Sequence, residues 1–276
     1  MAPVLVVVVV ALTTRLVGAY YHETVGVPAA TALYLQELSA AQCQAAPSFQ
    51  SEQPYFAALL IALESGQTSV CGAALVNERR LLTAAHCWWD GVLQARALTA
   101  VLGSGALYRG GTRLATSDVR LHDDYDPVTL RGDVAVAVVP RVHTSPLIQP
   151  IALPPPSLIN ATLHGWRGQV TGFGRNADYT GVPALRTLNE VPVLLASGRR
   201  CTRVSGASAE DALCSTSASA RGPCGADSGG PLTVRHGGRD VLVGVVTWAW
   251  ARDCVSHEPA GYTRVSNYLP WLLDQL

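Results

Sequence analysis

Residues 222–232 read GPCGADSGGPL, a stretch that surrounds Ser228 with glycines and follows it with a proline. A serine hydroxyl is a weak nucleophile unless a neighbouring base takes its proton and an acid orients that base. Glycines fit a tight loop whose backbone N–H groups converge on a developing oxyanion. Taken alone, the stretch is also compatible with an ordinary loop, so its interpretation depends on the rest of the chain.

Two upstream segments supply the missing residue types. LLTAAHC (81–87) places His86 beside Cys87 after an apolar strand, and RGDVAVAVV (131–139) places Asp133 where another strand begins. Each is weak by itself, because TAAH is more often ordinary core and an aspartate before a strand is usually a turn residue. Their order His, Asp, Ser, with cysteines near two of the three, favours a catalytic triad.

The chain around these segments consists of short apolar runs separated by Gly, Pro, Asn and Asp. Runs of four to nine β-branched and aliphatic residues between turn signals indicate strands. No crossover helices separate them, which argues against a parallel α/β sheet. The sequence therefore predicts an all-β fold with strands in YFAALLIAL (55–63), LTAVLG (98–103), VAVAVV (134–139), VPVLL (191–195) and VLVGVVTW (241–248).

A proline-rich connection, LPPPSLINATLHG (153–165), divides the strand-rich region roughly in half. It contains Asn160 in the triplet Asn-Ala-Thr, a candidate glycosylation acceptor, although many such triplets stay unmodified. Only the tail, residues 267–276, has leucines at helix spacing. We therefore expect two β-rich halves followed by a C-terminal helix.

Composition excludes several classes of protein. The 276 residues include 20 arginines, no lysine and 20 acidic residues, so the formal charge is zero and the basic surface of a nucleic-acid binder is absent. Hydrophobic residues make up 49% of the chain, which excludes a disordered protein. The longest apolar run, residues 4–12, is far shorter than the roughly 20 residues of a membrane span. We therefore expect neither nucleic-acid nor membrane partners.

The start of the chain has the pattern of a secretory signal. The apolar run at residues 4–12 precedes the small-x-small triplet Val17-Gly18-Ala19, which predicts a signal peptide over residues 1–19 with cleavage after Ala19. The alternative is a buried strand at the chain start. Secretion would place the protein in an oxidising, extracellular compartment, where cysteines form disulfides.

The seven cysteines point to disulfides, not to a metal site. No CxxC pair occurs and the histidines do not cluster with cysteines, so we expect no metal. Because seven is odd, at least one cysteine is free or paired outside the chain. Cys43 lies far upstream of the other six and is the candidate, which makes a dimer through Cys43 the alternative to a monomer.

Seven short segments share one pattern: CGAAL (71–75), TAAHC (83–87), DVAVAVV (133–139), VTGFG (170–174), CGADSGGPL (224–232), TW (247–248) and GYTRV (261–265). These motifs resemble those of the chymotrypsin-like serine proteases, in the correct order, from about residue 54 to residue 273. The leader YYHETVGVPAA (20–30) and SGQTSVCGAAL (65–75) look closest to digestive chymotrypsin-like enzymes of moths and butterflies.

This resemblance implies two antiparallel Greek-key β-barrels with a C-terminal α-helix and an active site between the halves. It assigns the general base to His86, the orienting acid to Asp133 and the nucleophile to Ser228, with backbone N–H groups of Ala226 and Ser228 as oxyanion donors. It implies a propeptide-like leader over residues 20–42, a protease domain over residues 43–276, and no cofactor. The implied disulfides are Cys71–Cys87, Cys201–Cys214 and Cys224–Cys254.

The resemblance also identifies a specificity pocket. Gly222 corresponds to the pocket floor, where trypsin-like members carry an aspartate, so no acid is available for a substrate Lys or Arg. Ala249 and Ala260 correspond to wall positions that are glycine in wide-pocket members, and their methyl groups predict a preference for small or medium apolar side chains. The alternative is that both alanines tilt aside and leave an ordinary chymotrypsin pocket.

Two departures from the family put activity in doubt. Ala226 replaces a glycine, and its Cβ is unfavourable if the backbone there needs a glycine conformation. Asp227 is present to receive a newly formed Ile or Val amine, but no Ile-Val-Gly-Gly occurs near Cys43, and residues 16–78 contain neither Lys nor Arg.

Two functions therefore remain at this stage. The first is a secreted serine endopeptidase that cleaves protein or peptide substrates after small or medium apolar residues, with protease inhibitors as candidate partners. The second is a catalytically weak or inactive homologue that acts by binding. The absence of lysine fits either a strongly alkaline environment, because arginine keeps its charge there, or a codon bias toward Arg, Ala and Gly.

Overall fold

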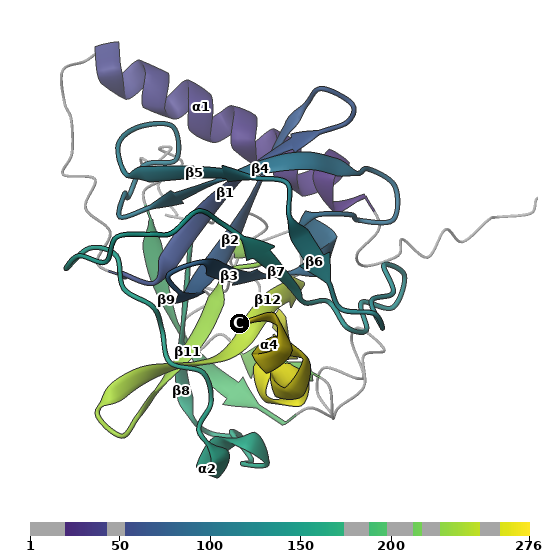
Figure 1. The fold of residues 1–276 in the computed structure, drawn as a ribbon, viewed down its shortest axis with the longest axis vertical. Coiled ribbons are helices and arrows are strands. Elements are labelled where there is room, and N and C mark those ends of the chain that lie inside the picture. Colours follow the sequence, from purple (N-terminus) through teal and green to yellow (C-terminus); the bar gives the residue numbers. More distant parts are fainter. Residues whose placement is uncertain (1–19, 43–52, 174–187, 198–211, 217–226, 249–259) are drawn as a thin grey trace, which may run out of the picture.

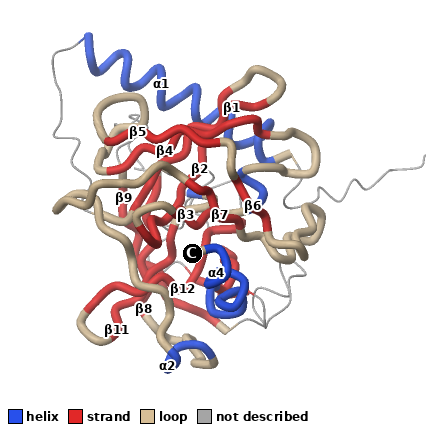
Figure 2. Tube along the Cα trace, viewed as in Figure 1, coloured by secondary structure: helices blue, strands red, loops and turns tan. Residues whose placement is uncertain are grey.

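Within the described residues, thirteen strands, one long helix and several short helices form the protein in this computed structural model. Figures 1 and 2 show the strands through the middle of the molecule, with the long helix at one end. The residues that the structure describes are 20–42, 53–173, 188–197, 212–216, 227–248 and 260–276.

The first half is a seven-stranded antiparallel sheet in the order β5-β4-β1-β2-β3-β7-β6. Side chains alternate between the two faces of a strand. In β1, Leu59 and Ile61 therefore enter the main core while Phe56 and Ala58 join a second apolar cluster. The strands are β1 (Phe56–Leu63), β2 (Thr68–Asn77), β3 (Arg80–Thr83), β4 (Ala95–Leu102), β5 (Thr112–Thr116), β6 (Val119–Leu121) and β7 (Ala135–Val138).

The second half closes into a barrel in the order β10-β13-β12-β11-β8-β9. Its interior is filled by aliphatic side chains and by Tyr262, which is 1% exposed. The strands are β8 (Arg167–Gly172), β9 (Asn189–Ala196), β10 (Ala212–Thr216), β11 (Pro231–His236), β12 (Arg239–Trp248) and β13 (Ala260–Arg264). Two β-rich units of this kind confirm the predicted fold class.

The expected C-terminal helix is present as α4 (Leu269–Gln275), which follows the short turn η4 (Val265–Tyr268). Leu272 is buried against the main core while Leu273 is exposed, as one apolar face of a helix requires. A further short helix, α2 (Pro156–Ile159), lies in the proline-rich connection between the halves.

The leader also forms a helix. The sequence pattern predicts a helix only in the C-terminal tail. The turn η1 (His22–Gly26) continues into α1 (Val27–Gln42), whose sequence VPAATALYLQELSAAQ is rich in strong helix formers. One face of this helix is buried, with Ala30 and Leu33 in the apolar cluster that contains Phe56 and Ala58 of β1. Figure 1 shows α1 lying across the first sheet.

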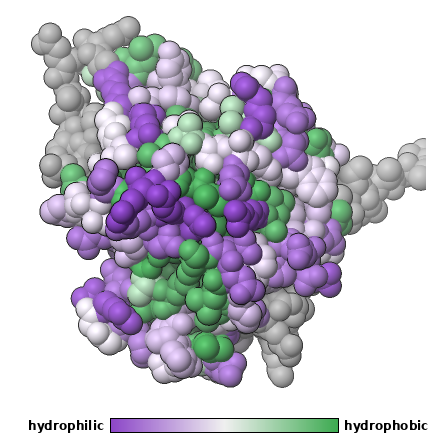
Figure 3. All heavy atoms as spheres, viewed as in Figure 1, coloured by the Kyte–Doolittle hydropathy of each residue, from purple (hydrophilic) through white to green (hydrophobic). Residues whose placement is uncertain are grey.

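On the face drawn in Figure 3, polar and apolar side chains are interspersed. Across the described ranges, no helix combines the length and the apolar character that spanning a membrane requires.

Candidate active site

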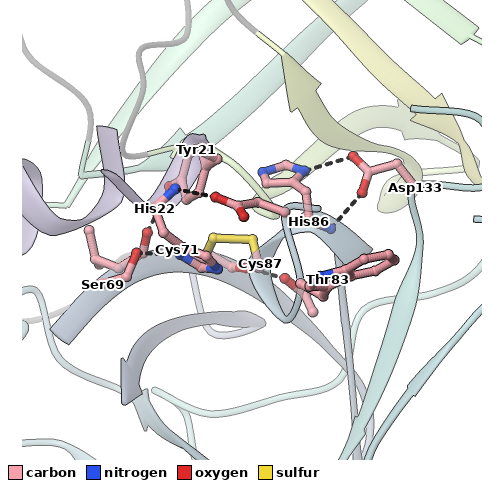
Figure 4. The surroundings of a disulfide bond; sticks show 12 residues. Tyr21, His22, Ser69, Cys71, Thr83, His86, Cys87 and Asp133 are labelled. Carbon is pink, nitrogen blue, oxygen red and sulfur yellow. Dashed lines mark hydrogen bonds and ion pairs between the residues drawn. A yellow bond between two sulfur atoms is a disulfide. The ribbon is translucent and has the colours of Figure 1, made fainter. Parts of the chain in front are cut away.

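His86 and Asp133 are brought together by two neighbouring strands. β3 and β7 pair antiparallel with Thr83 opposite Ala135, so the residues just after β3 and just before β7 lie at the same end of the sheet. His86 sits in the turn η2 (Ala85–Cys87). Its Nδ1 lies 2.8 Å from Asp133 Oδ2, and its backbone N–H donates to Asp133 Oδ1 at 2.9 Å (Figure 4). The carboxylate therefore holds both the position and the ring orientation of His86.

The segment that bears Asp133 is also held by the second half of the molecule. The Thr263 hydroxyl, from β13, donates to the Asp133 carbonyl oxygen at 2.8 Å. The same hydroxyl lies 2.7 Å from the Thr247 hydroxyl of β12. All three residues are buried, so this network joins the two halves directly behind the His86–Asp133 pair.

Ser228 lies where the two halves touch. The Gly72 N–H, from β2, donates to the Ser228 carbonyl oxygen at 2.7 Å, and the Gly229 N–H donates to Val246 of β12 at 2.8 Å. Gly229 has φ +78°, and a Cβ there would lie 3.0 Å from Cys87 Sγ while colliding with the Gly72 carbonyl. Only glycine satisfies both the conformation and the space, which explains the glycine that follows the serine.

The Cys71–Cys87 disulfide lies beside this junction. Its S–S distance is 2.02 Å, and it connects β2 to the turn that carries His86 (Figure 4). Ligand atoms of Cys71, Cys87 and His86 lie within 4.8 Å of one another. Both sulfurs are committed to the disulfide and offer no thiolate, so the cluster is a structural link, not a metal site.

Tyr21 of the leader packs against these residues. Its ring contacts the His86 ring edge-on with centroids 4.7 Å apart, and its hydroxyl donates to the Val70 carbonyl at 2.7 Å. Burial raises the pKa of Tyr21 above its ordinary value, a hydrogen bond with the Ser228 side chain opposes this rise, and the Asp227 carboxylate adds to it. His86 Nε2 is buried and has no hydrogen-bond partner within the described part of the chain. The Ser228 hydroxyl therefore makes no hydrogen bond to His86 Nε2 in this arrangement.

His22 anchors the same part of the leader. Its backbone N–H donates to Asp90 Oδ2 at 2.9 Å, and its Nδ1 lies 2.8 Å from Ser69 Oγ. Burial lowers the pKa of His22 to about 4; the Asp90 carboxylate opposes this shift, and His86 adds to it. His22 is therefore neutral near pH 7.

Several predicted site residues fall outside the described ranges. These are Gly222, Ala226, Ala249, Cys43, Cys201, Cys224 and Cys254. Within the described ranges, Ala260 is buried in β13 beside Ser215 of β10, and Asp227 is buried next to Ser228. Cys214 is disulfide-bonded, but its partner lies outside the described residues. Asn160 is exposed and directly follows α2.

Sequence reasoning did not assign a site role to Tyr21 or His22. Two signals could have indicated them. The leader carries Gly26, Ala30 and Leu33 at the spacing of one helix face. The run YFAALLIAL (55–63) is apolar at every position, which is typical of a strand that is covered on both faces.

The comparisons with known proteins agree with this geometry. The family model described as Trypsin matches residues 44–272. A collagenase from Hypoderma lineatum is 30% identical over 221 residues, covering 79% of this chain and 81% of the relative. Serine protease SP24D from Anopheles gambiae is 33% identical over 215 residues, covering 77% and 74%. The solved structure of HL collagenase has a TM-score of 0.73 and 29% identity, covering 83% of this chain and 96% of that chain. The chain therefore belongs to the trypsin family of serine proteases.

Proposed function

We propose that the protein is a secreted serine endopeptidase in which Ser228 attacks the scissile carbonyl. His86 takes the proton of the serine and later gives it to the leaving amine, while Asp133 holds the imidazole in the required tautomer. The observation that carries the proposal is the buried His86–Asp133 pair, with 2.8 Å between Nδ1 and Oδ2, in a chain that belongs to the trypsin family. In the apolar surroundings of the pair, the carboxylate stabilises the imidazolium that forms during attack.

The substrate class follows from the pocket that the family resemblance identifies. Gly222 provides no acid for a basic side chain, and the methyl groups of Ala249 and Ala260 narrow the slot. We expect peptides ending in Ala, Val or Leu to be cleaved faster than those ending in Phe or Arg. The oxyanion would be bound by the backbone N–H groups of Ala226 and Ser228.

Secretion and the remaining disulfides complete the proposal. A signal peptide over residues 1–19 would export the chain, and the Cys71–Cys87 bond is the kind of link that an oxidising compartment preserves. The domain would comprise residues 43–276 after a leader over residues 20–42, with Cys201–Cys214 and Cys224–Cys254 as further disulfides and Asn160 as a glycosylation site.

Peptide hydrolysis by the leader-free enzyme tests the proposal. Asp133→Asn should lower kcat by about 10⁴-fold through the wrong tautomer of His86, with a small effect on KM. Asp118→Asn is the matched control, because Asp118 is exposed and remote from His86. Equal activity of Asp133→Asn and wild type would refute the triad, and faster cleavage after Arg would refute the pocket.

A second candidate function is that of a non-catalytic homologue that acts by binding. The missing activation sequence and Ala226 favour it, and so does the absence of a hydrogen bond to His86 Nε2 within the described part of the chain. An intact fold with no hydrolysis in any leader-free preparation would select this alternative.

A further inference from the structure

We infer that the first sheet carries a binding surface for the chain's own leader, residues 20–42, and that the bound leader inhibits the enzyme until it dissociates. The inhibitory part rests on the proposed function. The binding part does not, because it follows from contacts that are independent of catalysis.

One face of the leader is shaped for this surface. From Gly26 onward the buried positions are Gly26, Ala29, Ala30, Leu33 and Glu37, whose spacing places them along one side of the helix. A Cβ at Gly26 would overlap the Ser69 hydroxyl. The opposite side of the helix is open to solvent, where Leu35 is 57% exposed.

The far end of the leader is held by a buried carboxylate. Glu37 is 5% exposed, and its Oε1 accepts the N–H of Leu107 at 2.7 Å and that of Tyr108 at 3.1 Å. Arg109 donates from Nη2 to the Glu37 carbonyl at 2.6 Å, and the Tyr108 hydroxyl donates to the Ala30 carbonyl at 2.9 Å. These contacts gather the loop between β4 and β5 around the helix, and hydrogen bonds to a carboxylate are the stronger kind.

The other end of the leader, at His22, donates a hydrogen bond to a buried carboxylate of the domain. Asp90 is fully buried, and its Oδ1 accepts the N–H groups of Val92 and Leu93 at 2.9 and 2.8 Å. Its Oδ2 accepts the N–H of His22 from the leader at 2.9 Å. The domain therefore presents a preformed acceptor that the leader fills.

The bound leader blocks the residues that would perform catalysis. His86 is 1% exposed and Ser228 is 6% exposed, and the leader residue Tyr21 packs directly on His86. The Tyr21 ring itself lies edge-on against the His86 ring, with the ring centroids 4.7 Å apart. Removal of the Tyr21 ring should therefore expose the His86 ring to solvent.

Activation then needs dissociation as well as a cut. Every contact described above lies outside residues 43–52, the segment that joins the leader to the domain. A break within that segment leaves all of these contacts in place. The nicked protein should therefore keep its leader and stay inhibited until the leader is released.

A nicked full-length protein tests this directly. Residues 44–50 are replaced by the recognition sequence of a site-specific protease, and the cut protein is examined by gel filtration. We expect the leader to elute with the domain. In a second measurement, a fluorescently labelled leader peptide is titrated with the leader-free domain. Glu37→Ala in the peptide should raise the Kd for the domain at least tenfold. Leu35→Ala is the matched control on the exposed side of α1 and should leave the Kd unchanged. A leader that separates from the domain immediately after the cut would contradict the inference that the first sheet binds it.

The accessibility of His86 to solvent is measured by its modification with diethyl pyrocarbonate, a reaction that does not depend on catalysis. We expect modification of His86, relative to the exposed His143, to rise at least tenfold when the leader is removed or when Tyr21→Ala is introduced. Equal modification of His86 with the leader bound would overturn the inference. His86 that becomes reactive without any gain in hydrolysis would support the leader site and refute the proposed function instead.

Discussion

Replacement of Gly229 by alanine should destabilise the protein far more than replacement of Gly66, although both glycines have a positive φ. Gly229 has φ +78° and Gly66 has φ +85°. An L-residue in this conformation costs roughly 1–2 kcal/mol, and both variants incur that cost. The difference lies in the surroundings. A Cβ at Gly66 meets nothing within 4 Å, whereas one at Gly229 meets Thr83, Gly72 and Cys87.

The crowding at Gly229 sets the magnitude. Inserting a methyl group into a packed site costs about 1–3 kcal/mol. We therefore expect Gly66→Ala to lose roughly 1–2 kcal/mol and Gly229→Ala about 2–5 kcal/mol of unfolding free energy. Urea unfolding of the oxidised full-length protein measures both, and an unchanged m value shows that the unfolded state is the same. Equal losses in the two variants would refute the close packing of this loop against β2 and the disulfide.

Three further predictions concern the leader and its linkage to the domain. Burial lowers the pKa of His22 to about 4, so protonation of His22 favours the unfolded state. The free energy of unfolding should therefore be unaffected above about pH 6.5 and decrease as the pH falls, by about 3 kcal/mol at pH 4. His22→Gln should flatten this pH dependence of unfolding, and an equally steep profile would contradict the assignment. Trypsin should not activate the wild-type protein, because residues 16–78 contain no Lys or Arg. A chain with Arg-Ile-Val-Gly-Gly at residues 41–45 should gain at least tenfold in hydrolysis after the same treatment and removal of the freed leader. Cys43 should react with an alkylating reagent without prior reduction, or link two chains into a dimer on non-reducing gels. A disulfide between Cys43 and another cysteine of the same chain would refute the proposed disulfide pairing.

Much of the fold could be predicted from local sequence. The run at 55–63 contains β1 (Phe56–Leu63), and the run at 241–248 lies within β12 (Arg239–Trp248). Such runs of aliphatic and β-branched residues between turn signals identify strands because the signal is local. The leucines of the tail identified α4 for the same reason.

The leader was harder to predict, because its role depends on contacts between distant residues. Alanine, leucine and glutamine in 27–42 favour a helix, but nothing local reveals that Tyr21 reaches His86 or that Glu37 binds the loop between β4 and β5. The order of the motifs led us to propose His86, Asp133 and Ser228 as a triad, whereas Gly222, Ala226 and Ala249 lie outside the described residues. The pocket and the narrower likeness to moth and butterfly enzymes therefore stay predictions.

The most direct test of the account is covalent labelling of the leader-free protein by a fluorophosphonate, with the adduct located by mass spectrometry. Stoichiometric labelling requires a serine activated by a neighbouring base. We predict one adduct per chain on Ser228, lost in Ser228→Ala and slowed at least a hundredfold in His86→Ala. Leader-free, folded protein that stays unlabelled, or that carries its adduct on another residue, would contradict the claim that Ser228 is the nucleophile.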